Sequence, residues 1–166
     1  MSYTRNTDPT YYYKNSGAVN CGSFALRLNE WYEPEEDYDE IYDWIIGMSW
    51  DYDDYEISNL YADIIIDRIL NDFSGEIEIC DGRAPSTSDT ELIAFATFCE
   101  YDESEEYCNW DFHFKVFRNG IWQQKCGCFP PEFCELDEWG RYTSKVTYFY
   151  HKIGDTNESQ CIHKRR

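Results

Sequence analysis

Basic residues are scarce in this 166-residue chain, which has 14 Lys and Arg against 33 Asp and Glu and a formal net charge of −19. Binding of DNA or RNA depends on the neutralisation of phosphates by Lys and Arg, so this balance argues against a direct nucleic-acid ligand. Between residues 28 and 67 the chain has no Lys or Arg at all. We therefore expect any macromolecular partner to be a basic peptide or protein.

Long apolar runs are also missing. No stretch approaches the about 18 apolar residues of a membrane span, and the N-terminal residues lack the apolar run of a signal peptide. We expect a soluble cytoplasmic protein without a membrane partner. In that compartment the eight cysteines are expected to be reduced thiols.

Aromatic residues, by contrast, are abundant and make up 19% of the chain. Disordered segments carry far fewer aromatic residues, and the length suits one compact domain. We expect residues 1–166 to form one folded domain with an aromatic-rich core and an acidic surface. The sequence does not indicate an oligomeric state.

Apolar side chains that recur at steps of three and four residues predict two helices. The first begins at or just before Cys21, has Asn20 as its N-cap, and ends at Pro34. The second covers residues 57–73 and ends at Ser74 and Gly75.

Strand patterns follow these helices. Residues 92–101 predict a buried strand, residues 111–126 a hairpin with Asn119 and Gly120 as its turn, and residues 144–152 a last strand. Residues 1–19 are expected to be an extended lead-in. Helices followed by antiparallel strands indicate an α+β fold, in which the N-terminal helix packs on the sheet.

Two residues suggest thiol chemistry. Cys21 lies at a predicted helix N-terminus, where the helix dipole favours a thiolate, and His113 lies in a strongly patterned strand. A two-residue turn pairs Lys115 with Gln124, so Gln124 becomes a diagonal neighbour of His113 on the same face. A thiol, a base and a polar group that orients the base are the minimum set for acyl transfer. The alternative is that Cys21 and His113 are ordinary buried residues of a helix and a strand.

The sequence resembles small papain-like thiol hydrolases related to the NlpC-type amidases and peptidases of bacteria and phages. Residues 20–26 (NCGSFAL) are similar to the Asn-Cys-Tyr-x-Tyr-Ala-Leu that opens the family's catalytic helix. Residues 111–114 (DFHF) match its Asp-aromatic-His-aromatic strand, and residues 122–127 (WQQKCG) resemble its Trp-Ser-His-Lys-x-Gly. The resemblance covers residues 17–152, and residues 30–56 look like an acidic, aromatic-rich insertion or a divergent region.

The resemblance implies a cysteine-dependent peptidase or amidase without a cofactor. Cys21 would be the nucleophile, and its backbone N–H would form part of the oxyanion hole, with Asn20 as a positioning residue. His113 would be the general base and then the acid. Gln124 stands where the family has a second His and would orient His113. The negative charge of the chain favours a basic peptide or protein as the substrate.

A second hypothesis rests on the acidic segment itself. Carboxylates between tyrosines could imitate a nucleic-acid backbone and block a basic nucleic-acid-binding protein. The protein would then be a catalytically inactive binding protein, such as a phage inhibitor of a host defence system, and a phage-encoded protein would act in the host cytoplasm. The alternative is a solvated face that only increases solubility. The residues of this acidic patch are Glu35, Glu36, Asp37, Asp39, Glu40, Asp43, Asp51, Asp53 and Asp54.

Zinc is a minor alternative. Cys126, Cys128 and Cys134 lie near one another in the sequence, and Cys99 or Cys108 could supply a fourth thiolate. Their spacing fits no standard zinc finger or ribbon, so we expect no metal.

Overall fold

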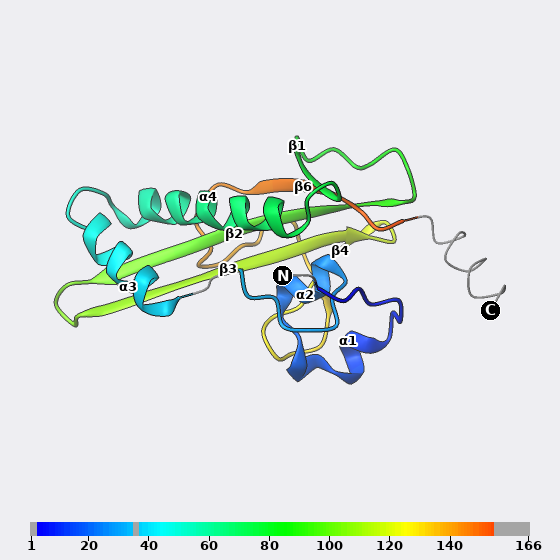
Figure 1. The fold of residues 1–166 in the computed structure, drawn as a ribbon, viewed down its shortest axis with the longest axis horizontal. Coiled ribbons are helices and arrows are strands. Elements are labelled where there is room, and N and C mark those ends of the chain that lie inside the picture. The colour runs from blue at the N-terminus through cyan, green and yellow to red at the C-terminus, as the bar shows by residue number, and fades with distance from the viewer. Residues whose placement is uncertain (1–2, 35–36, 155–166) are drawn as a thin grey trace.

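The computed structural model describes residues 3–34 and 37–154. Within this part of the chain the fold is α+β, with four α-helices, a short 3₁₀ helix (η1) and a six-stranded sheet (Figure 1). The elements are α1 (Tyr11–Lys14), η1 (Ser16–Ala18), α2 (Cys21–Leu26), α3 (Tyr38–Met48), α4 (Asp54–Asp72), β1 (Ile77–Cys80), β2 (Thr90–Asp102), β3 (Tyr107–Arg118), β4 (Ile121–Gln124), β5 (Glu132–Phe133) and β6 (Thr147–Lys152).

The sheet has the strand order β1-β6-β2-β3-β4-β5, and all of its pairs are antiparallel. β2 and β3 form a long ribbon that is paired from Leu92↔Phe117 to Asp102↔Tyr107. In Figure 1, α4 lies along β2, α3 lies beside one end of the ribbon, and α2 lies next to β3 near the other end. One hydrophobic core joins these helices to the sheet through side chains such as Phe24, Ile65 and Phe95.

The hairpin is confirmed as predicted. Asn119 and Gly120 both have positive φ, as a type I′ turn requires, and Lys115 pairs with Gln124. The predicted strands 92–101 and 144–152 correspond to β2 and to β6, which begins at Thr147. The second predicted helix is α4, and it is three residues longer at its start because Asp53 and Glu56 form a capping box there.

The first helix begins at Cys21 with Asn20 as its N-cap, but its predicted end at Pro34 is wrong. α2 ends at Leu26 because Arg27 adopts a left-handed conformation (φ 56°) while its guanidinium bonds to Glu91 at 2.8 Å. The chain then turns back along the helix, and Tyr32 reaches the N-cap residue Asn20. This long-range ion pair outweighs the helical periodicity of the sequence.

Two segments contain helix where the sequence indicated none. The lead-in 1–19 is not simply extended, since it contains α1 and η1. The acidic segment contains α3, whose N-cap Asp37 accepts hydrogen bonds from the backbone N–H groups of Asp39 and Glu40. Its apolar residue Ile45 is fully buried and holds α3 against the body of the protein.

Among the described helices, none combines the length and the apolar character of a membrane span. Seven of the eight cysteines lie in the described residues, and no disulfide joins any of these seven.

Candidate active site

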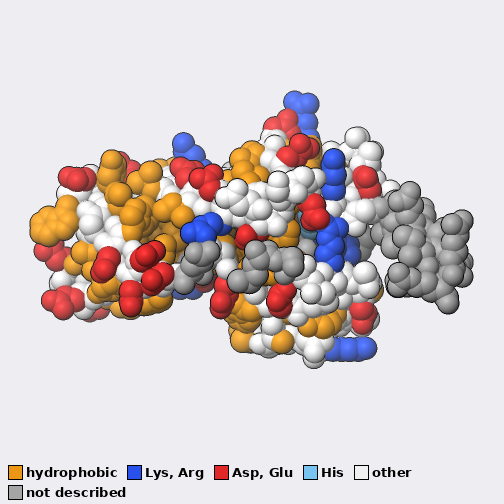
Figure 2. Space-filling model, in the orientation of Figure 1, with side chains coloured by type: hydrophobic (Ala, Val, Ile, Leu, Met, Phe, Trp, Pro, Cys, Tyr) orange, Lys and Arg blue, Asp and Glu red, His pale blue; other side chains and the backbone are white. Residues whose placement is uncertain are grey.

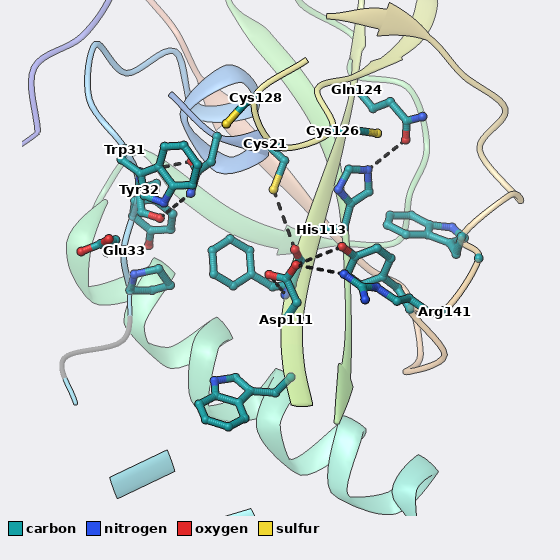
Figure 3. A pocket seen from close by; sticks show the side chains of 18 of the residues that line it. Cys21, Trp31, Tyr32, Glu33, Asp111, His113, Gln124, Cys126, Cys128 and Arg141 are labelled. Carbon is teal, nitrogen blue, oxygen red and sulfur yellow. Dashed lines mark hydrogen bonds and ion pairs between the residues drawn. The ribbon is translucent and has the colours of Figure 1, made fainter. Parts of the chain in front are cut away.

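A cleft of about 790 Å³ lies where α2, the middle of β3 and the loop after β5 meet. Its lining includes Cys21, His113 and Gln124, so the structure brings all three predicted catalytic residues to one cavity. In Figure 3, Trp31 and Glu33 lie on one side of Cys21 and Asp111, and His113 and Arg141 lie on the other. We call the cleft-lining residues Trp31, Glu33, Asp37 and Tyr38, which lie just before α3 and at its start, the acidic wall, and the cleft-lining residues Trp139, Arg141 and Tyr142, in the loop after β5, the arginine wall.

Cys21 is the first residue of α2 and is only 6% exposed. Its thiol donates to the backbone carbonyl of Phe112 at a distance of 3.8 Å. Burial raises the pKa of Cys21 to about 12, and the Asp111 carboxylate adds to this effect, while hydrogen bonds from the backbone of Phe114 and Gly22 oppose it. The resting group at neutral pH is therefore a thiol.

His113 is held from three directions on β3. Its Nε2 is 2.9 Å from Oε1 of Gln124, its ring stacks on Tyr142 with 5.1 Å between the centroids, and the ring of Trp139 meets it edge-on. Burial lowers the pKa of His113, although the bond to Gln124 works in the opposite direction. The resting imidazole is therefore neutral near pH 7, and Gln124 fixes its orientation.

Nε2 is occupied by Gln124, so Nδ1 is the nitrogen left to accept a proton. Figure 3 shows that this nitrogen lies on the side of the ring that faces Cys21. Cys21 and His113 are not hydrogen-bonded to each other in the structure, and the partner of the thiol is Phe112. The site is thus a neutral thiol, whose hydrogen-bond partner is the Phe112 carbonyl, and a neutral imidazole, both of which line one cleft.

Asn20 joins the start of α2 to the chain that returns from it. Its Oδ1 accepts from the backbone N–H groups of Ser23 and Tyr32, at 2.9 and 3.2 Å, and its Nδ2 donates to the Tyr32 carbonyl at 2.7 Å. Because Asn20 is 5% exposed, these bonds are shielded from water. Asn20 therefore connects the start of α2, next to Cys21, to Tyr32 in the returning segment, and its role as a positioning residue stays a prediction.

Two buried lysines hold the surroundings of the site. Lys115, 1% exposed, donates to the backbone carbonyls of Glu135 and Glu138, and its ammonium lies 4.5 Å from the ring centroid of Trp139. Lys125, fully buried, donates to the carbonyls of Ser16, Val19 and Gly127. One hairpin thus anchors both the arginine wall and the segment that leads to Cys21.

From the sequence, no role in the site was assigned to the residues of the arginine wall or to Asp111. Asp111 accepts from the Tyr142 hydroxyl at 3.2 Å and lies 3.7 Å from Arg141. The Asp-aromatic-His pattern contained a signal for Asp111. No local pattern marked Trp139 or Arg141, because they lie in a loop without regular structure.

The acidic patch is not one surface. Asp37 caps α3 and lines the cleft, Asp53 caps α4, and Asp54 accepts a hydrogen bond from the backbone N–H of Tyr101. Glu35 and Glu36 lie outside the described residues. The remaining members, Asp39, Glu40, Asp43 and Asp51, are exposed on α3 and just after it. Three of the nine patch residues thus have local structural roles.

Within the described residues, no three His, Cys, Asp or Glu side chains are grouped closely enough to hold a metal ion. Cys126, one of the three cysteines of the zinc alternative, donates to a carboxylate oxygen of Glu132 at 3.7 Å.

Comparison with known proteins leaves the class of protein open. The chain matches no protein-family model, no curated protein and no solved structure. The assignment of function therefore rests on the geometry of the cleft.

Proposed function

We propose that the protein is a papain-like, cysteine-dependent peptidase or amidase that acts by thiol acyl transfer on a basic peptide or protein. The observation that carries this proposal is the convergence of Cys21, His113 and Gln124 in one cleft, with Gln124 bound to Nε2 of His113. This arrangement leaves Nδ1 for the thiol proton.

The neutral resting state decides how the reaction would begin. His113 takes the proton of Cys21 through Nδ1 as the sulfur attacks the carbonyl carbon of the amide. The imidazolium then gives that proton to the leaving amine, which leaves an acyl group on Cys21. Water, deprotonated by His113, hydrolyses the thioester and frees the carboxylic acid and the thiol. Gln124 holds the ring in place during both proton transfers.

Mass spectrometry of a mixture of synthetic basic peptides tests the proposal. Cleavage of a main-chain amide adds one water to the products, and hydrolysis of a side-chain amide raises the mass by about one unit, so the spectra distinguish peptidase from amidase activity. We expect Cys21→Ala and His113→Ala to abolish product, and Gln124→Ala to lower the rate by about 10-fold to 100-fold. Cys128→Ser, which changes another thiol of the same cleft, is the control and should retain the rate. Product formation that survives Cys21→Ala would refute the proposal.

A second candidate function is an inactive acidic binding protein that blocks a basic nucleic-acid-binding partner. The observation that favours it is the protonated, buried thiol of Cys21, which has the Phe112 carbonyl as its partner. The exposed carboxylates on α3 would supply the binding surface. Figure 2 shows acidic side chains around apolar ones at the end of the molecule where α3 lies.

Displacement of a labelled DNA duplex from a basic DNA-binding protein tests this second function. The Cys21→Ala protein should displace the duplex, and added salt should weaken the effect. A variant with Asn or Gln at Asp39, Glu40 and Asp43 should fail to displace it. Displacement by this variant at the wild-type level would exclude α3 as the binding surface.

A further inference from the structure

We infer that the acidic wall of the cleft is a subsite for a positively charged side chain, Lys or Arg, of a bound peptide. The inference deepens the proposed function and rests on it for the statement that the peptide is a substrate. The residues of the subsite are Trp31, Glu33 and Tyr38, and all three line the cleft that contains Cys21.

The first argument is the balance of charge in the cleft. Among its described lining residues, four are carboxylates, Glu33, Asp37, Asp111 and Glu138, and one is a cation, Arg141. Arg141 lies 3.7 Å from Asp111, so its charge is already matched. The carboxylates of the acidic wall have no matching cation within the described part of the cleft, and a cleft with low-dielectric walls concentrates their field.

The second argument is independent and concerns the aromatic rings. The protein places its own cations over the rings of the arginine wall, with Lys115 over Trp139 at 4.5 Å and Arg141 over Tyr142 at 5.7 Å. In the described structure, no Lys or Arg lies over Trp31 or Tyr38. A large exposed ring beside a carboxylate is the environment that binds an ammonium or guanidinium group.

The third argument is accessibility. Trp31 is 41% exposed and Tyr38 is 66% exposed, and Glu33 is also exposed to solvent. Glu33 forms no hydrogen bond or ion pair with the described residues. The ring of Tyr38 packs against the ring of Trp110, another residue that lines the cleft, at 4.6 Å between the centroids. The subsite is therefore supported by the protein and open to a ligand.

The position of the subsite beside the thiol determines on which side of the cleaved amide the selected Lys or Arg lies. Figure 3 shows Trp31 and Glu33 on the side of Cys21 that is opposite His113. A peptide whose amide lies between Cys21 and His113 extends on one side along the arginine wall and on the other along the acidic wall. The Lys or Arg that the subsite selects thus lies on the acidic-wall side of the cleaved amide.

Binding to the catalytically inactive Cys21→Ala protein tests the subsite without hydrolysis. Two probes, acetyl-Gly-Ala-Lys-Ala-Gly-amide and the same peptide with norleucine in place of Lys, differ in the ammonium group. Titrations followed by NMR, with the backbone amide signals of the cleft residues as reporters in every variant, give both dissociation constants. We expect the Lys peptide to bind at least about fivefold more tightly at low ionic strength.

Two variants and a control assign this preference to the wall. Glu33→Gln and Trp31→Leu should each reduce it to less than about twofold. Glu78→Gln, the same change of charge at an exposed residue of β1, should preserve it. Equal affinity for the two peptides, no saturable binding of the Lys peptide at millimolar concentration, or a preference that survives both wall variants would overturn the inference. Failure of peptide hydrolysis by the wild-type protein would instead refute the proposed function and leave the binding result standing.

Discussion

The thiol of Cys21 is buried, donates to a carbonyl and lies near the Asp111 carboxylate, and each of these features favours the protonated form. In many reactive cysteines the thiolate is already present at neutral pH because a cation or an imidazolium stabilises it. Here the neighbouring imidazole is neutral, because burial lowers the pKa of His113. The residue that we propose as the nucleophile is therefore a protonated thiol at neutral pH.

This state predicts the pH dependence of alkylation. Iodoacetamide reacts with the thiolate, and burial raises the pKa of Cys21 to about 12, so the alkylation rate of Cys21 should rise continuously from pH 6 to about pH 10. Peptide mapping by mass spectrometry separates Cys21 from the other cysteines and gives the rate for each. Cys128, which is exposed, serves as the internal reference.

A rate that is constant between about pH 5 and pH 8 would contradict this prediction. Such a plateau would show that a thiolate-imidazolium pair exists before the substrate binds.

At the scale of the element, α2 is held in place by the segment that follows it. Gly22, in the first turn of α2, faces Tyr32, and a Cβ at position 22 would lie 2.9 Å from Cδ1 of Tyr32 and 3.3 Å from Cε2 of Phe114. Tyr32 cannot move away easily, since it is fully buried and its backbone is bonded to Asn20.

Gly22→Ala should therefore lower the free energy of unfolding by about 1–2 kcal/mol, since overpacking exceeds the gain in helix propensity. Gly47→Ala in α3 is the matched control, because nothing lies within 4 Å of a Cβ there and the better helix former should leave stability equal or higher. Urea unfolding measures both. A Gly22→Ala protein as stable as the Gly47→Ala protein would show that Tyr32 is not packed as described.

The elements also show what the sequence can predict. Local signals were sufficient for the capped start of α2 at Asn20, for α4 and for the Asn119-Gly120 hairpin, because each is determined by residues close in the chain. The bond between His113 and Gln124 followed from the register of that hairpin. The end of α2 could not be predicted, because the ion pair between Arg27 and Glu91, 64 residues apart, determines it.

α3 was missed because residues 30–56 were interpreted as an acidic, aromatic-rich insertion or a divergent region. The Asp37 cap and the buried residue Ile45 hold this helix in place. No role was predicted for the arginine wall, because its residues lie in a loop and follow neither the helical nor the strand periodicity of apolar residues. The features of the site that neighbouring residues determine were predictable, and those that depend on packing between distant segments were not.

For the molecule as a whole, two buried groups make stability depend on pH. His151 is 1% exposed with both ring nitrogens unpartnered, and burial, together with the charge of Arg5, lowers its pKa to about 4 from 6.5. Although burial opposes it, the guanidinium groups of Arg118 and Arg27 lower the pKa of Glu91 to about 2 from 4.5. In each case the unfolded chain binds a proton more readily than the folded protein.

Stability should therefore fall as the pH decreases from about 6.5 to 4 because of His151, and from about 4.5 to 2 because of Glu91, by on the order of 3 kcal/mol for each group. Urea unfolding at pH 7.5 and pH 5.0 measures the first effect. His151→Phe, which retains a ring against Phe73, should remove most of the difference between the two pH values. An unchanged difference in this variant would assign the pH dependence to other groups.

The contacts that build the cleft join parts of the chain that are made at very different times. The thiol of Cys21 meets Phe112 across 91 residues, and Lys125 reaches Val19 and Ser16 across 106 and 109 residues. Such contacts form late in folding, because the entropy of closing long loops opposes them. During synthesis the segment that carries Cys21 leaves the ribosome well before the hairpin that carries His113 and Lys125. The thiol therefore lacks its base until most of the chain has been made, and the cleft can assemble only after the hairpin is present.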